Sequence, residues 1–228
     1  MRFTIRARTT ALFLAGIITA LVLANLVVHF GRLELGWGQS YGLRRQFDLG
    51  NEANIPTAYS ALALLASASL LFLIGRIKLA ERDRFRFEWI GLAIGFLFLA
   101  IDEATMIHEN IYRIPRALGL DIGTLSWMLP YAVILPVLGI IYARFLIHLE
   151  PRYRRLFLLA GVLYVGGALG MEASGDLVRV AYGDQTNWPN TLVMTAEETL
   201  EMSGVAVFLV TLLVYVRDRV ESVAVAFR

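Results

Sequence analysis

Acidic side chains in apolar surroundings are the feature of this sequence with the clearest chemical meaning. Eight of its 19 aspartates and glutamates fall within three long apolar stretches, which hold a single basic residue, Arg179. An ionised side chain at the centre of a bilayer costs about 2.5–3.5 kcal/mol on insertion scales. The eight acids are Asp102, Glu103, Glu109, Glu172, Asp176, Glu197, Glu198 and Glu201. Protons, a metal ion or water must compensate their charge.

The spacing of these acids places them on common helical faces, because an α-helix turns by about 100° per residue. Each of the three apolar stretches carries one such stripe. The stripes are Asp102 with Glu109, flanked by His108 on one side and Glu103 on the other; Glu172 with Asp176; and Glu197, Glu198 and Glu201. Lipid offers these side chains no partner, so we expect all three stripes to point into a helix bundle.

A mixed set of carboxylates and imidazoles without sulfur suits iron, manganese or zinc. The chain has no cysteine, which excludes thiolate ligands and disulfides. Its Glu198-x-x-Glu201 spacing is similar in outline to the di-iron and di-manganese carboxylate bundles, although it lacks their Glu-x-x-His pairs. The predicted metal ligands are Asp102, His108, Glu109, Glu172, Asp176, Glu198 and Glu201, with Glu103, Glu197 and His29 as additional candidates.

Six apolar stretches of about 20 residues must position these side chains, and each can cross a hydrocarbon core of about 30 Å. They are predicted at 11–30, 56–75, 89–111, 125–147, 156–182 and 191–216. The composition agrees, since 57% of the residues are hydrophobic and 18% are charged, against about 25% charged in soluble domains. The sequence therefore predicts one all-α transmembrane bundle over residues 1–228, with a long outer segment at 31–55.

The basic residues predict how this bundle is oriented. Six crossings place both termini on one side, and the termini with the connecting segments on that side hold 15 of the 21 lysines and arginines. The positive-inside rule therefore puts both termini in the cytoplasm. With this orientation, the acids of the three stretches lie at about the same depth, in the outer half of the membrane.

The end of the outer segment reads Phe47-Asp48-Leu49-Gly50-Asn51-Glu52-Ala53-Asn54-Ile55-Pro56-Thr57. Together with the acidic motifs, this stretch resembles uncharacterised bacterial multi-pass membrane proteins. The resemblance implies no activity. With the six spans, it leads us to expect a location in the bacterial inner (cytoplasmic) membrane, with membrane lipids as partners.

Three functions fit these features. The first is a membrane-embedded metalloprotein, with an enzymatic reaction on a lipid or other apolar substrate that enters beside the fourth span, kinked by Pro130 and Pro136. The second is a proton- or cation-coupled transporter that uses the acids as a relay. The third is an accessory subunit whose acids pair with arginines of a partner membrane subunit. Nucleic acid is not an expected partner.

Structural interpretations exist for some of the acids. Arg179 follows Asp176 by three residues, so the two can form an ion pair on one helix face. A water-filled outer vestibule would solvate Glu109 and Glu197 without any ligand. Gly166 and Gly170 form a Gly-x-x-x-Gly pair, which is typical of close helix packing in membranes.

Overall fold

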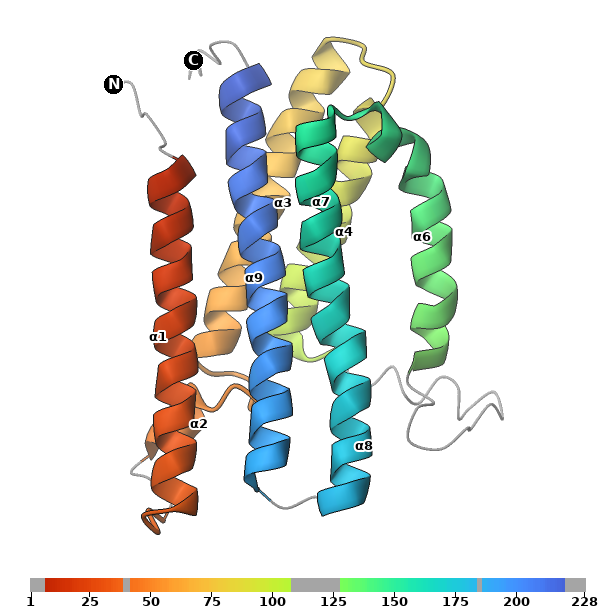
Figure 1. Ribbon diagram of the computed structural model, residues 1–228. Coiled ribbons are helices and arrows are strands. Elements are labelled where there is room, and N and C mark those ends of the chain that lie inside the picture. Colours follow the sequence, from red (N-terminus) through yellow and green to blue (C-terminus); the bar gives the residue numbers. More distant parts are fainter. Residues whose placement is uncertain (1–6, 39–41, 108–127, 184–185, 220–228) are drawn as a thin grey trace.

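The computed structural model describes residues 7–38, 42–107, 128–183 and 186–219, which form helices and short connections. The elements in chain order are α1 (Ala7–Leu33), α2 (Leu43–Phe47), α3 (Ile55–Ala80), α4 (Arg86–Thr105), α6 (Met128–His148), α7 (Pro151–Val165), the π-helix η4 (Gly166–Met171), α8 (Glu172–Tyr182) and α9 (Trp188–Arg219). The long helices run along one direction, and α1 begins at the end of the bundle where α9 ends (Figure 1). The predicted all-α class is confirmed for the described residues.

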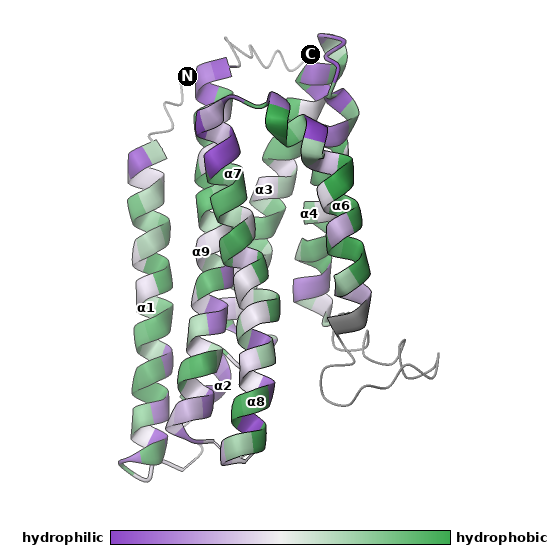
Figure 2. Ribbon diagram, turned by 45° about the vertical axis from the view of Figure 1, so that its right-hand side comes forward, coloured by the Kyte–Doolittle hydropathy of each residue, from purple (hydrophilic) through white to green (hydrophobic). Residues whose placement is uncertain are grey.

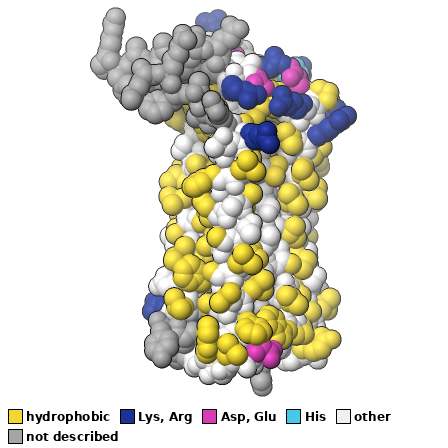
Figure 3. Space-filling model, turned by 60° about the vertical axis from the view of Figure 1, so that its left-hand side comes forward, with side chains coloured by type: hydrophobic (Ala, Val, Ile, Leu, Met, Phe, Trp, Pro, Cys, Tyr) yellow, Lys and Arg dark blue, Asp and Glu magenta, His cyan; other side chains and the backbone are white. Residues whose placement is uncertain are grey.

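Five helical segments within the described ranges are long and apolar enough to cross a membrane. They are α1, α3, Pro130–His148, Pro151–Tyr182 and α9. Hydrophobic residues dominate α1 and α6, whereas hydrophilic residues recur in the lower parts of α8 and α9 (Figure 2). On the face shown in Figure 3, hydrophobic side chains cover the middle of the bundle and charged ones gather towards its two ends. This is the surface of a helical membrane protein.

Helix α4 is shorter than the third predicted span, 89–111. It ends at Thr105, because Met106 takes the left-handed conformation (φ 58°) and its N–H bonds to the carbonyl of Asp102. Charged residues at both ends confine its apolar part to Trp89–Ile101, so α4 is not among the five segments above. The expectation of one uninterrupted helix to residue 111 is wrong, and Asp102 lies in the last turn of α4.

Helix α9 is the centre of the bundle and packs against α1, α3, α7, η4 and α8. Two glycines let α7 and η4 approach it closely. A Cβ on Gly204 would lie 2.7 Å from the backbone nitrogen of Tyr164 and 2.9 Å from the carbonyl oxygen of Ala160. A Cβ on Gly167 would lie 2.8 Å from the carbonyl oxygen of Glu197.

The glycine pair expected to mediate helix packing does not do so within the described structure. Gly166 and Gly170 have open space where a Cβ would be. Ala160, Tyr164 and Gly167 follow the i, i+4, i+7 spacing and form the face towards α9, so Gly166 lies about 100° around the helix from it. The packing prediction therefore named the wrong glycines.

An aromatic core closes the end of the bundle where α4 begins. Trp89 is 2% exposed, and its ring lies 4.9 Å from that of Tyr215 and 5.0 Å from that of Phe145, measured between centroids. Phe157 adds a third ring contact at 6.2 Å, which is edge-on like that of Phe145. These rings join α4, α6, α7 and α9 at one level.

Helix α6 stands apart from the other helices over most of its length (Figure 1). Phe145 is the one fully buried residue in the range 130–148, and Ile140 is 76% exposed. Pro136 lies inside the helix and cannot donate a backbone hydrogen bond there. Helix α6 is therefore anchored by its C-terminal end, while the end that carries Tyr131 packs loosely.

Candidate carboxylate site

Three of the predicted ligands or additional candidates lie on one stretch of α9. Glu197, Glu198 and Glu201 are each partly buried in the centre of the bundle. Gly167 brings η4 against this stretch, since its Cβ position is also 2.8 Å from Cγ of Glu201. A π-helix is rare and occurs frequently at functional sites. The only π-helix within the described ranges thus lies against the acids of α9.

Acids from other elements face the same region. Glu201 is under the electrostatic influence of Glu103 on α4 and Glu172 on α8, as well as of its neighbours on α9. Glu198 is influenced by Glu103 and also by Glu52, from the connection between α2 and α3. The structure therefore brings together carboxylates from α4, α8, α9 and the outer segment.

Of the two acids near the end of α4, Glu103 is the one that faces those of α9. It lies seven residues after Phe96, hence on the same helix face, and Phe96 stacks on Phe208 of α9 with centroids 4.5 Å apart. Asp102, which the sequence favoured, is about 100° away on the helix. Asp102 influences the phenol of Tyr131, and both Asp102 and Glu103 influence that of Tyr164.

These two tyrosines are site residues that sequence reasoning missed. Tyr164 of α7 is influenced by Glu201, Glu103, Asp102 and Glu198. Tyr131, near the start of α6, is influenced by Asp102, Glu172 and Glu201. A buried tyrosine usually finds a polar partner for its hydroxyl, and that is the signal that could have drawn attention to them.

Asp176 forms an ion pair with Arg179 on α8. The structural interpretation of this acid is confirmed by that contact. Arg179 also acts on Glu197 of α9, so the guanidinium lies at the edge of the carboxylate site. The other acid of α8, Glu172, lies one turn before Asp176.

A ligand set for a metal is not assembled within the described part of the chain. Residues 7–38, 42–107, 128–183 and 186–219 contain no group of three or more histidines, aspartates and glutamates placed to hold a metal ion. His108 and Glu109, two of the predicted ligands, lie outside the described residues.

His29, the additional histidine candidate, faces other partners. Its Nε2 lies 3.1 Å from Oδ1 of Asp48, and its Nδ1 lies 3.3 Å from the hydroxyl of Thr191. All three residues are buried. Both ring nitrogens of His29 are thus engaged where α1, the outer segment and α9 meet.

Asp48 is held as an anion at this junction. Burial acts to raise the pKa of its carboxyl group, but hydrogen bonding and the charge of His29, together with the Arg44 guanidinium and the Gly50 N–H, outweigh it. The pKa of Asp48 therefore lies below its ordinary value of 3.8.

Residues 11–216 match a domain of unknown function, DUF8692. The chain belongs to the DUF8692 family. Neither a curated protein nor a solved structure matches it. The DUF8692 match extends from α1 into α9 and so includes every candidate site residue. A family of unknown function is consistent with the resemblance to uncharacterised proteins noted from the sequence.

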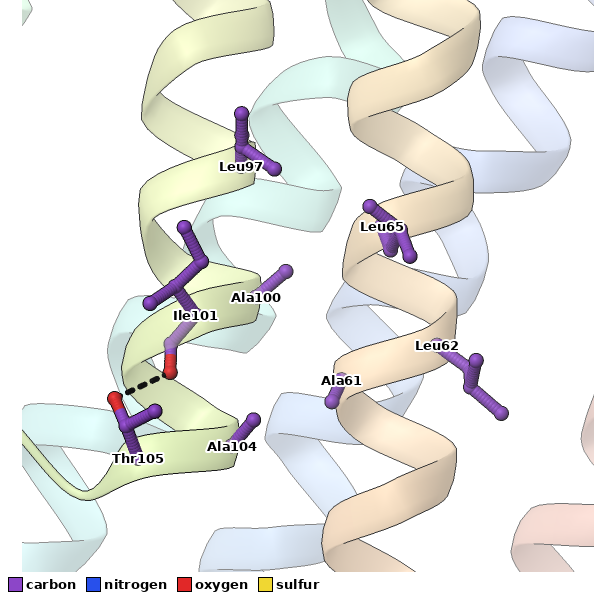
Figure 4. Close-up of a pocket in the computed structure, with 8 residues that line it drawn as sticks. All are labelled: Ala61, Leu62, Leu65, Leu97, Ala100, Ile101, Ala104 and Thr105. Carbon is purple, nitrogen blue, oxygen red and sulfur yellow. Dashed lines mark hydrogen bonds between the residues drawn. The ribbon is translucent and has the colours of Figure 1, made fainter.

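A separate groove of about 250 Å³ lies between α3 and α4 of this DUF8692 chain. Ala61, Leu62 and Leu65 of α3 line it together with Leu97, Ala100, Ile101, Ala104 and Thr105 of α4 (Figure 4). The Thr105 hydroxyl donates to the carbonyl oxygen of Ile101 at 2.6 Å, so the lining offers a ligand almost no polar group. None of the residues that line the groove is an acid of the carboxylate site.

Proposed function

We propose that this protein is a membrane-embedded metalloprotein that binds one or two divalent transition-metal ions at its carboxylate site. The observation that carries the proposal is the mutual influence of acids from α4, α8, α9 and the outer segment. Like charges a few ångströms apart in a low dielectric cannot all stay ionised. One divalent ion offsets two of these charges and two ions offset four, with carboxylate oxygens as ligands for iron, manganese or zinc.

The proposed ligands come from different helices. Glu103, Glu172, Glu198 and Glu201 are the described candidates; they influence one another electrostatically but would have to move closer together to share an ion. Arg179 offsets one further charge beside Glu197. His108, which lies outside the described residues, is the proposed nitrogen ligand. A bound ion would supply Lewis-acid chemistry, which polarises a carbonyl or phosphoryl oxygen.

The substrate class that fits this site is a lipid or another apolar molecule. Helix α6 is exposed along most of its length, yet Tyr131 near its start is under the electrostatic influence of acids of α4, α8 and α9. An apolar molecule in the bilayer would therefore reach the acids by passing between α6 and the bundle. The tyrosine hydroxyl would meet its polar group there.

The metal content of purified protein tests this proposal. We expect the protein to retain iron, manganese or zinc in detergent. The Glu201→Gln variant should bind the same metal at least about tenfold more weakly, since even residues that only support a ligand cost 10–100-fold when removed. The matched control is Glu88→Gln, at the opposite end of α4.

Equal metal content in the unmodified protein and in Glu201→Gln would contradict the metalloprotein. The transporter would then be the better account, and proton uptake into vesicles would be the measurement to pursue. If metal is bound and Glu88→Gln loses as much as Glu201→Gln, the ion lies elsewhere in the protein.

We further propose that both termini are cytoplasmic and that the protein resides in a bacterial inner membrane. The α3–α4 connection, the α6–α7 connection and the end of α9 lie at one end of the bundle (Figure 1). Together with the helix turns beside them, they carry most of the lysines and arginines of the described residues. Reporter fusions at Arg84 and Arg154 should therefore read cytoplasmic, while fusions at Gln46 and Asn187 should read external. A reversed reading at two or more of these sites would overturn the orientation.

A further inference from the structure

We infer that residues 43–54, here called the cover segment, close the carboxylate site on its outer side and place Glu52 within it. The inference rests on the proposed function for the role of the site, and on separate contacts for the position of the segment. These contacts join the cover segment to α1 and α9 through buried polar groups.

Asp48 is the main attachment of the cover segment. It is 3% exposed and accepts hydrogen bonds from His29 of α1 (3.1 Å), from Nε of Arg44 (3.0 Å) and from the N–H of Gly50 (3.1 Å). Hydrogen bonds to a charged group are roughly twice as strong as those between neutral groups. The other ring nitrogen of His29, Nδ1, lies 3.3 Å from the hydroxyl of Thr191, so Asp48 is linked to α9 through His29.

Asn25 forms a second attachment and is fully buried. Its side-chain oxygen accepts the N–H of Leu49 at 3.0 Å, and its side-chain nitrogen donates to the hydroxyl of Thr195 at 2.8 Å. One side chain of α1 therefore fixes the cover segment and α9 at the same point.

Asn54 closes the far end of the cover segment. Its side-chain nitrogen donates to the carbonyl oxygens of Asp48 and Asn51, both at 2.7 Å. Its side-chain oxygen accepts the N–H of Thr57 at 3.0 Å and so caps the first turn of α3. The segment is thus a tight loop that is held at both ends, and Glu52 lies between the two.

The apolar side of the cover segment rests on the turn of α9 that precedes the acids. A Cβ on Gly50 would overlap the sulfur of Met194, so the backbone of the cover segment lies directly against this side chain. Leu49 shares a buried cluster with Met202 of α9. Glu198 lies one turn from both methionines, which explains why Glu52 is among the groups that act on it.

Glu52 therefore differs from the other acids in the element that positions it. The other acids lie on helices of the bundle, whereas Glu52 lies on a loop whose position depends on Asp48 and Asn25. Loosening this loop would open the outer side of the site to water and would remove one carboxylate at the same time.

The absence of cysteine allows a direct test with full-length protein reconstituted in vesicles. A Glu198→Cys variant serves as reporter, and its rates of modification by a cationic and an anionic methanethiosulfonate reagent are measured from outside. Adding Asp48→Asn should raise both rates about tenfold or more, because it removes charged hydrogen bonds that hold the cover segment. Arg44→Gln, which removes the partially exposed partner, should raise them less.

The same assay tests whether the Glu52 carboxylate lies close to position 198. Adding Glu52→Gln should lower the ratio of the cationic to the anionic rate several-fold, because a nearby carboxylate attracts one reagent and repels the other. Glu34→Gln is the control, since Glu34 lies in the outer segment just after α1 but bonds to the indole N–H of Trp188. That variant should leave the ratio unchanged.

The inference is overturned if Asp48→Asn and Arg44→Gln leave both rates as they were, or if Glu52→Gln and Glu34→Gln change the ratio equally. Neither readout depends on a metal, because the reporter replaces one of the proposed ligands. Unchanged metal content in Glu201→Gln would contradict the proposed function alone. The position of the cover segment is tested separately, by the modification rates.

Discussion

The Trp89→Ala variant should lose about 3–5 kcal/mol of unfolding free energy, as other buried tryptophan truncations do. Trp89 is 2% exposed and contacts rings from three other helices, so its removal leaves a large cavity where α4, α6, α7 and α9 meet. The loss is measured from unfolding curves of the detergent-solubilised protein.

Phe87→Ala provides the control for this experiment. Phe87 lies on the same helix two residues earlier, but it is 64% exposed and faces outward. We expect its truncation to change the unfolding free energy by less than about 0.5 kcal/mol. Equal losses in the two variants would mean that the aromatic core does not hold this end of the bundle together.

Replacing Gly204 with valine should destabilise the bundle by about 3 kcal/mol or more, because the new side chain would overlap the backbone of α7. The two helices would have to separate, and η4 would move away from Glu197 and Glu201. We therefore expect reduced thermal stability and, if metal is bound, reduced metal content in the same preparation.

Gly161→Val is the matched control, since a Cβ at Gly161 would meet open space. This variant places the same side chain on α7 but on its exposed side. Its thermal stability should stay close to that of the unmodified protein. A similar loss at both positions would show that the effect arises from helix propensity and not from helix packing.

Local patterns in the sequence predicted the elements of this fold well. Apolar stretches of this length specify membrane helices, because a helix satisfies its backbone polar groups in lipid within a single segment. The same patterns could not predict where α4 stops, because the left-handed Met106 leaves no signature in hydropathy. They also could not show which neighbour a helix face meets.

Because the sequence does not show which neighbour a helix face meets, the predicted and observed site residues differ. Helical periodicity grouped Asp102 with Glu109, but the stacking of Phe96 on Phe208 fixes the rotation of α4 and turns Glu103 towards α9 instead. Gly166 was favoured over Gly167 for the same reason, since spacing alone does not reveal the face in contact. Glu52 and its attachment through Asp48 depend on residues far apart in the chain, which periodicity does not address.

The anchoring of α6 at one end has a consequence for how this protein would respond to its membrane. A helix packed along its whole length has its tilt set by its neighbours, whereas α6 contacts them mainly around Phe145. Its tilt would then follow the thickness of the surrounding bilayer, at a cost of fractions of a kcal/mol per ångström of mismatch. The distance between Tyr131 and the acids of the bundle would change with acyl-chain length, so lipid composition would tune access to the carboxylate site.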